Sequence, residues 1–243
     1  MLVCGLVSKG IALLVLFTPF ILNFAISSAI AGYVAYQAYQ KGLSGEEIGI
    51  EVQKAIFTYN FYWSIIQVGI GIWVIRLMGG FKEFKKVVTI KDIITNPAKS
   101  IGLILGLAAL TQAIIWVYMV INAYVYGGWE EYMKIWERVV KSLPLYSKIY
   151  LIAIAPFTAG IFEEVIWRWF GIETLSKYFG TNKAVIIQAI AFGIWHGISP
   201  YAIVTAIIGV IYGLIYLRRK RLLTLMAAHT LADIVGFTLA FAR

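Results

Sequence analysis

Three groups of polar residues in the last third of this apolar chain have the types and spacing that hydrolytic chemistry needs. Each group combines acids, bases or an aromatic ring at a separation of one helical turn. The groups are Glu163-Glu164-x-x-x-Arg168, Phe192-x-x-x-His196 and His229-x-x-x-Asp233. His196 and His229 are the only two histidines in the chain, and both fall in these groups.

The first group places three charges in a run that otherwise reads as a lipid-spanning helix. A charged residue at the centre of such a helix costs about 2.5–3.5 kcal/mol even on the lenient insertion scale, so these side chains must face protein or water. On an α-helix Glu164 and Arg168 share a face and can pair, whereas Glu163 points about 100° away. The spacing therefore predicts a neutral support pair and leaves Glu163 as the acid able to react.

Glu163, His196 and His229 together can hydrolyse a peptide bond. A desolvated carboxylate can act as general base on a water that a nearby imidazole helps to hold, and a second imidazole can donate to the oxyanion. The chain has no G-x-S-x-G elbow and no Ser or Cys beside a motif histidine, so an acyl-enzyme is not indicated. H-E-x-x-H is also absent. Zinc held by Glu163, His196, His229 and Asp233 and a purely structural use of each histidine remain as alternatives.

Composition identifies the class of protein. Apolar residues make up 61% of the 243 residues and charged residues only 14%, and mean hydropathy is +0.83. These values exclude an ordinary soluble domain and indicate a polytopic membrane protein. The net charge of +9 is explained by Lys and Arg in short loops rather than by nucleic-acid binding. The lone Cys4 excludes an internal disulfide.

The apolar runs predict an all-α, polytopic transmembrane helical bundle of about seven spans, forming a single domain over residues 1–243. We expect no cleaved signal peptide, because the first run is too long for one. The runs cover residues 11–39, 56–78, 100–126, 149–172, 184–198, 201–217 and 222–241.

Two further segments, 81–95 and 129–141, mix Lys or Glu with aromatic residues. We predict that they are amphipathic helices at the membrane interface.

The distribution of basic residues predicts that the N-terminus is inside and the C-terminus outside. With that orientation, the inner loops contain more Lys and Arg than the outer ones. The inner set is Lys9, Arg76, Lys82, Lys85, Lys86, Lys91, Lys99, Lys177, Lys183, Arg218, Arg219, Lys220 and Arg221. The outer set is Lys41, Lys54, Lys134, Arg138, Lys141, Lys148 and Arg243.

The run at 184–198 is short, roughly 22 Å at helical rise against a hydrocarbon core of ~30 Å. Gly197, Ser199 and Pro200 then end the helix, so His196 is predicted at a break inside the bilayer. Counting along the helices places His229, Glu163 and His196 about 12, 15 and 20 Å from the inner surface. We therefore expect one water-filled cavity reached from the inner side.

The three motifs together resemble those of the CAAX protease and bacteriocin-processing (CPBP/ABI) family, which includes the Ras-converting-enzyme-type CAAX endopeptidases. The resemblance covers about residues 149–240, the expected catalytic core. It implies an intramembrane glutamic endopeptidase without a cofactor, in which Glu163 and His196 activate water and His229 with Asp233 forms the oxyanion site. Glu164 and Arg168 would be supporting residues and Phe192 would line the pocket. Relatives commonly have one more helix, which would give eight spans.

The resemblance also implies a substrate and a location. The partner would be a membrane-associated protein or peptide, prenylated in the best-known cases, cleaved near its C-terminus. The protein would be a multi-pass protein of the cell membrane whose active site is open to the cytoplasmic side. It would contact the lipid bilayer and would bind no nucleic acid.

One residue departs from the pattern of the CAAX-processing enzymes, which usually have Asn where this chain has Asp233. An amide can donate a hydrogen bond to an oxyanion, and an ionised carboxylate cannot. Asp233 is therefore expected either to stay protonated or to orient and charge His229, which then donates alone.

Two other classes of function compete with the endopeptidase. Glu and His inside a membrane also build proton relays, as in a proton-coupled transporter or channel. That reading predicts paired broken helices in two related halves, but the first three spans contain no intramembrane ionisable residue apart from tyrosine. A catalytically idle immunity or scaffold protein on the same fold is the other alternative.

Overall fold

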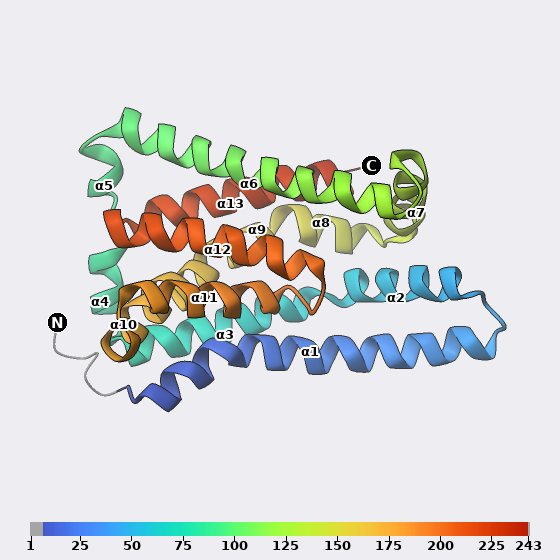
Figure 1. Cartoon of the computed structure of the whole chain (residues 1–243), viewed down its shortest axis with the longest axis horizontal. Coiled ribbons are helices and arrows are strands. Elements are labelled where there is room, and N and C mark those ends of the chain that lie inside the picture. The colour runs from blue at the N-terminus through green and yellow to red at the C-terminus, as the bar shows by residue number, and fades with distance from the viewer. Residues whose placement is uncertain (1–6, 243) are drawn as a thin grey trace.

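The computed structural model describes residues 7–242, apart from the side chain of Asp92, so Cys4 and Arg243 lie outside it. Long helices run roughly side by side along one axis (Figure 1). The helices are α1 (Lys9–Gln40), α2 (Gly45–Tyr59), α3 (Phe61–Leu77), α4 (Gly80–Val87), α5 (Lys91–Ile94), α6 (Pro97–Val125), α7 (Trp129–Ser142), α8 (Leu145–Ala153), α9 (Ala155–Thr158), η1 (Ala159–Ile172), α10 (Glu173–Phe179), α11 (Thr181–Trp195), α12 (Pro200–Arg219) and α13 (Leu222–Phe241). No strand occurs between residues 7 and 242, which confirms the all-α prediction.

The seven predicted apolar runs are helical, but two of them are divided between helices: residues 56–78 include the end of α2 and all of α3, and residues 149–172 include most of α8, α9 and η1. Five helical stretches within residues 7–242 are long and apolar enough to cross a membrane: α1, α6, the continuous stretch Leu145–Phe179, α12 and α13. A sixth results if α3 and α4 count as one span, although they meet at a bend of 99°. The run at 184–198 became α11, whose 15 residues are too few for a full crossing. The predicted count of about seven is therefore higher than length and composition support.

Short helices close the two ends of the bundle. At the end where the described chain begins, α4 and α5 lie across the long helices, and α7 does so at the other end (Figure 1). Both α4 and α7 separate apolar from charged residues, with acids in the first turn and lysines in the last. The predicted amphipathic segments 81–95 and 129–141 are thus found as short crosswise helices.

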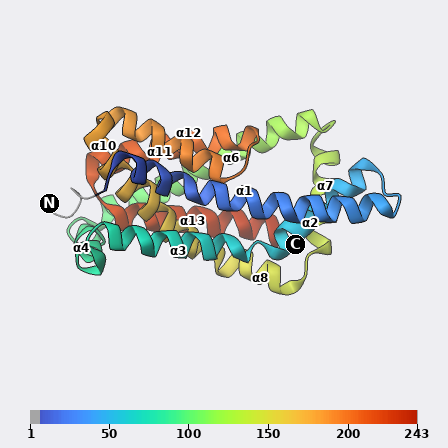
Figure 2. The ribbon, with the colours of Figure 1, turned by 90° about the horizontal axis from the view of Figure 1, so that it is seen from below.

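The first two helices extend beyond the rest of the bundle. α1 has 32 residues, or roughly 48 Å at helical rise, and packs against α2 over its last part. Figure 2, seen from below, shows the α1–α2 hairpin projecting past α13 at the end that carries α7. Ser44 begins α2 with a capping box, its hydroxyl and the Glu47 carboxylate bonding each other's backbone N–H.

α11 and α12 form a tight hairpin that positions His196. Gly197 has φ +105°, a conformation that suits glycine, and Pro200 begins α12 at a position where its missing N–H costs nothing. A β-carbon at Gly193 would lie 2.5 Å from the Ala202 carbonyl oxygen and 2.8 Å from the Ala206 Cβ. Glycine at 193 is therefore what lets the two helices approach so closely.

This packing predicts that Gly193→Ala destabilises the protein. The added methyl group would push α12 away from α11, at a cost of about 1–3 kcal/mol in the free energy of unfolding. Gly102→Ala on α6 is the matched control, because nothing lies within 4 Å of its Cβ position. Thermal unfolding in detergent should show a lower midpoint for the first variant and an unchanged or higher one for the second. Equal midpoints would contradict the packing argument.

Candidate active site

The segment that carries the two acids is a π-helix, not the α-helix assumed from the sequence. η1 is a 14-residue helix with i→i+5 hydrogen bonds, and Pro156 just before it has no N–H to continue the α-helical ladder. More residues per turn means a smaller angle between neighbouring side chains. The wider turn therefore brings Glu163 and Glu164 closer to one face, where both approach the same imidazole.

Close contact between η1 and α13 places that imidazole. A β-carbon at Gly160 would lie 2.7 Å from the backbone nitrogen of Thr230, so only glycine permits this approach. His229 precedes Thr230 and reaches both acids. Its Nδ1 lies 2.8 Å from Glu164 Oε1, and its Nε2 lies 3.7 Å from Glu163 Oε2.

Glu164 is shared between two basic groups. Its Oε1 accepts the hydrogen bond from His229 Nδ1 and lies 3.2 Å from Arg168 Nη1. Glu164 and Arg168 are both fully buried. The predicted support pair is present, but it also fixes the histidine ring, a role the sequence assigned to Asp233.

Glu163 is held by only one of its oxygens. Oε1 accepts hydrogen bonds from Gln67 Nε2 and from Trp195 Nε1, each at 2.7 Å. Oε2 has no hydrogen bond to another described residue, although the whole residue is only 2% exposed. The carboxylate is thus fixed in orientation with one acceptor left for a reactant.

A second layer of hydrogen bonds holds Trp195. The Asn23 amide donates to the Trp195 carbonyl oxygen at 2.7 Å, and the Asn23 oxygen accepts from Tyr62 OH and Trp63 Nε1. Sequence analysis missed Gln67, Trp195 and Asn23 because it considered ionisable groups alone. The signal was present, since an amide inside an apolar span also needs partners.

His196 lies at the end of α11, next to Trp195, which donates to Glu163. Its Nδ1 is 2.9 Å from the Phe192 carbonyl oxygen. A carbonyl only accepts, so Nδ1 donates and the neutral ring keeps Nε2 as its basic position. The Phe192 ring lies between the two histidines, with centroids 4.9 Å from His196 and 6.1 Å from His229.

Phe192 also covers the buried cation. The Arg168 guanidinium carbon lies 4.2 Å from the Phe192 ring centroid and 5.3 Å from that of Tyr212, both cation–π contacts. Phe192 therefore contacts Arg168 and both histidine rings.

Asp233 stands on the reactive side of His229. Its Oδ2 lies 3.7 Å from His229 Nε2, too far for a hydrogen bond, and its side chain is 22% exposed. Asp233 is thus near the same ring nitrogen as Glu163, opposite the Glu164 contact.

Toward the basic loops, the helices around the cluster carry large side chains with almost no exposure, including Trp167, Phe170, Leu222 and Leu225. Exposure rises the other way, toward α7, through His229 and Asp233, and the turn after His196 is exposed. The opening on the inner side, expected from the sequence, stays a prediction.

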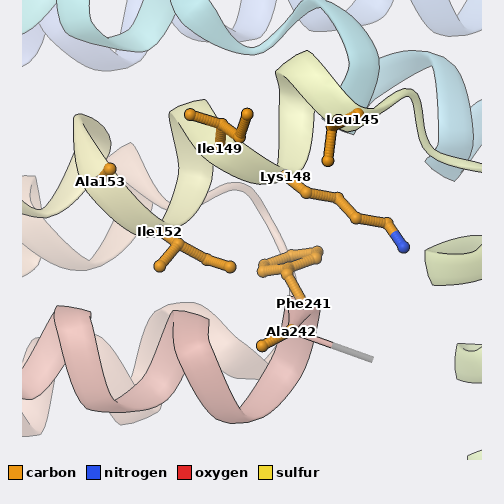
Figure 3. A pocket seen from close by; sticks show the side chains of 7 residues that line it. All are labelled: Leu145, Lys148, Ile149, Ile152, Ala153, Phe241 and Ala242. Carbon is orange, nitrogen blue, oxygen red and sulfur yellow. The ribbon is translucent and has the colours of Figure 1, made fainter.

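A separate cavity of about 430 Å³ lies between α8 and the end of α13 (Figure 3). Its lining is almost wholly apolar, with Lys148 at the edge. Phe241, which borders it, is 12 residues beyond His229, or about 18 Å along the helix. This cavity does not contain the acid–histidine cluster.

No set of three or more His, Cys, Asp or Glu side chains within the described part of the chain is arranged to hold a metal ion. Independence from metal stays a prediction.

Comparison with known families agrees with the motifs. Residues 145–235 match the sequence model of the family described as Rce1-like, type II CAAX prenyl endopeptidase. The match covers η1, α11, α12 and the part of α13 that carries His229 and Asp233. The resemblance noted from the sequence is confirmed over this stretch. No curated protein and no solved structure matches the chain.

The buried pair predicts a large cost for removing its cation. Arg168→Met keeps much of the volume but leaves Glu164 buried without a counter-charge, which should cost about 3–5 kcal/mol in the free energy of unfolding. Arg76→Met, at an exposed position of α3, should cost little. Denaturant unfolding in detergent compares the two. Similar stabilities would show that the pair does not offset the burial of Glu164, and adding Glu164→Gln to Arg168→Met should restore part of the loss.

Proposed function

We propose that this protein is an intramembrane endopeptidase that hydrolyses a peptide bond near the C-terminus of a membrane-associated or prenylated, CAAX-type protein or peptide. The observation that carries the proposal is the arrangement of Glu163. One carboxylate oxygen is fixed by two N–H donors, while the other is buried, makes no hydrogen bond to a described residue and lies 3.7 Å from His229 Nε2. The family match over residues 145–235 supports the class of reaction.

Glu163 would be the general base. Its Oε2 takes a proton from a water as the water oxygen attacks the scissile carbonyl, and the carboxyl group then gives that proton to the leaving amine. Fixing Oε1 removes the reorientation that a free carboxylate would need. His196, with Nε2 as its basic position, would hold the same water from the α11 side.

His229 would stabilise the oxyanion. Glu164 accepts from Nδ1, and the carboxylates of Glu163 and Asp233 lie on the other side, so the surroundings favour a ring that carries a positive charge. Such a ring can donate from Nε2 to the oxygen that becomes negative. Asp233 would contact the reacting groups rather than orient the ring, because Glu164 already does so.

The chain is a multi-pass membrane protein by its apolar helices and family match. We propose that it resides in the cell membrane and that its site is open to the cytoplasm, where C-terminal tails of membrane-associated proteins lie. Because exposure at the site rises toward α7, this proposal puts the α7 end in the cytoplasm. It thereby opposes the orientation predicted from the Lys and Arg count.

The proposed function predicts loss of cleavage when Glu163 is replaced. Purified protein should cut a quenched-fluorescence C-terminal peptide, prenylated or unprenylated, and Glu163→Ala should reduce kcat by at least about 10³-fold because the base is gone. Trp73→Phe, which changes a partly exposed side chain of α3, is the control and should keep full activity. A chelator should leave cleavage intact.

Cleavage that persists in the Glu163→Ala variant would exclude this mechanism. Loss of activity with chelator, restored by zinc, would instead favour the metal alternative. If no peptide is cut, the idle scaffold alternative is favoured.

The position of Asp233 predicts different results for two substitutions. Asp233→Asn should keep kcat within about tenfold, because an amide near His229 Nε2 can donate to the oxyanion. Asp233→Ala should lose most of the activity because it removes the polar group of residue 233 from beside His229 Nε2, where only Glu163 then remains. The ratio of the two kcat values is the measurement, and equal losses would contradict this role for Asp233.

A further inference from the structure

A row of polar side chains on α3 continues away from Glu163. Asn60, Ser64 and Gln67 are spaced at four and three residues, which places them on one helical face. Opposite them, Thr158 comes five residues before Glu163, one turn of a π-helix. Two pairs meet across the gap: Ser64 Oγ lies 2.7 Å from Thr158 Oγ1, and Gln67 Nε2 lies 2.7 Å from Glu163 Oε1.

The far end of this row is an unpartnered buried amide. Asn60 is 1% exposed, and neither its Nδ2 nor its Oδ1 makes a hydrogen bond to another described residue. Leaving such a group dry costs roughly 1–3 kcal/mol, whereas water can satisfy it. The Tyr150 hydroxyl lies 2.6 Å from Ser64 Oγ and donates to the Asn60 carbonyl oxygen at 3.4 Å, so polar atoms connect the two positions.

The row stops on the other side of Glu163. A β-carbon at Gly71, one turn beyond Gln67, would overlap the Phe162 side chain, whose ring fills that position. Ile70 and Val74 follow, both buried. The polar face therefore leads from Glu163 only toward the junction of α2 and α3, at the side of the molecule away from the basic loops.

We propose that Asn60, Ser64 and Thr158 form a path that supplies the hydrolytic water to Glu163. This inference rests on the proposed function, because hydrolysis is what would consume the water. The path itself depends only on how α3 packs against α9. Hydrolysis consumes one water molecule for each peptide bond that is cut. Each of these water molecules must reach Glu163 through the apolar interior of the bundle, where free water is scarce. Hydroxyl and amide groups that recur about once per turn of α3 offer that route.

The competing explanation is that these groups only join helices, as polar side chains in membrane proteins often do. Ser64 and Thr158 satisfy each other and fit that view. The Asn60 side chain does not, because its amide is buried and yet makes no hydrogen bond to another described residue. A path for water explains both the paired and the unpaired groups.

Reactivity of an introduced thiol tests the path without any need for turnover. Ser64→Cys is made in a Cys4→Ser background, which removes the only native cysteine. Only the thiolate is alkylated by iodoacetamide, and a thiolate forms in contact with water and not in hydrocarbon. Ile65→Cys in the same background is the matched control, since Ile65 is 65% exposed on the apolar outer surface of α3. Alkylation is followed by intact mass.

We expect the thiol at position 64 to react at least about tenfold faster than the thiol at position 65. Adding Asn60→Leu should remove most of that difference, because an apolar side chain interrupts the path, whereas Asn60→Ser should preserve it. Equal rates at 64 and 65, or a rate at 64 that Asn60→Leu does not change, would overturn the proposal. A reactive thiol in a protein that cuts no peptide would disprove the proposed function and leave the water path standing.

Discussion

The burial of Glu163, Glu164 and Arg168 inside an apolar bundle is the constraint on which this structure depends. Removing charges from water costs several kcal/mol per ion, and only close pairing with well-placed hydrogen bonds offsets that cost. Arg168 and His229 both contact Glu164 Oε1, and Gln67 and Trp195 donate to Glu163 Oε1. Arg168 lies on η1 with the acids, whereas His229, Gln67 and Trp195 come from α13, α3 and α11, so the acids connect four helices.

The backbone is adapted to these contacts at a few positions. Pro156 interrupts the α-helical ladder before the wider η1, and Gly160 lets α13 approach closely enough for His229 to reach both acids. Phe192 covers the guanidinium that the pair leaves facing the histidines. The result is an anisotropic site, sealed by large apolar side chains toward the basic loops and more exposed toward α7.

The sequence predicted which ionisable residues lie together better than it predicted their arrangement. Glu163, His229 and Asp233 were found because charge in an apolar run is costly, and the structure brings them together. Gln67 and Trp195 were missed because amide and indole groups are not ionisable and carry no signal by residue type. Only the folded structure shows that both contact Glu163. The direction of the opening stays a prediction, because counting residues along a helix gives depth but does not show which neighbours fill the space.

The exchange of roles between Glu164 and Asp233 follows from the same constraint. An imidazole has two nitrogens, and a buried acid already within hydrogen-bonding distance of Nδ1 leaves Nε2 for the reaction. An acid at 233 is therefore not needed to orient the ring, and its 3.7 Å separation from Nε2 fits a group that contacts the reactants instead. Asp in place of the amide adds negative charge where an oxyanion would form. In the proposed mechanism, a positively charged His229 ring, which lies near the carboxyl groups of Glu163, Glu164 and Asp233, would offset that charge.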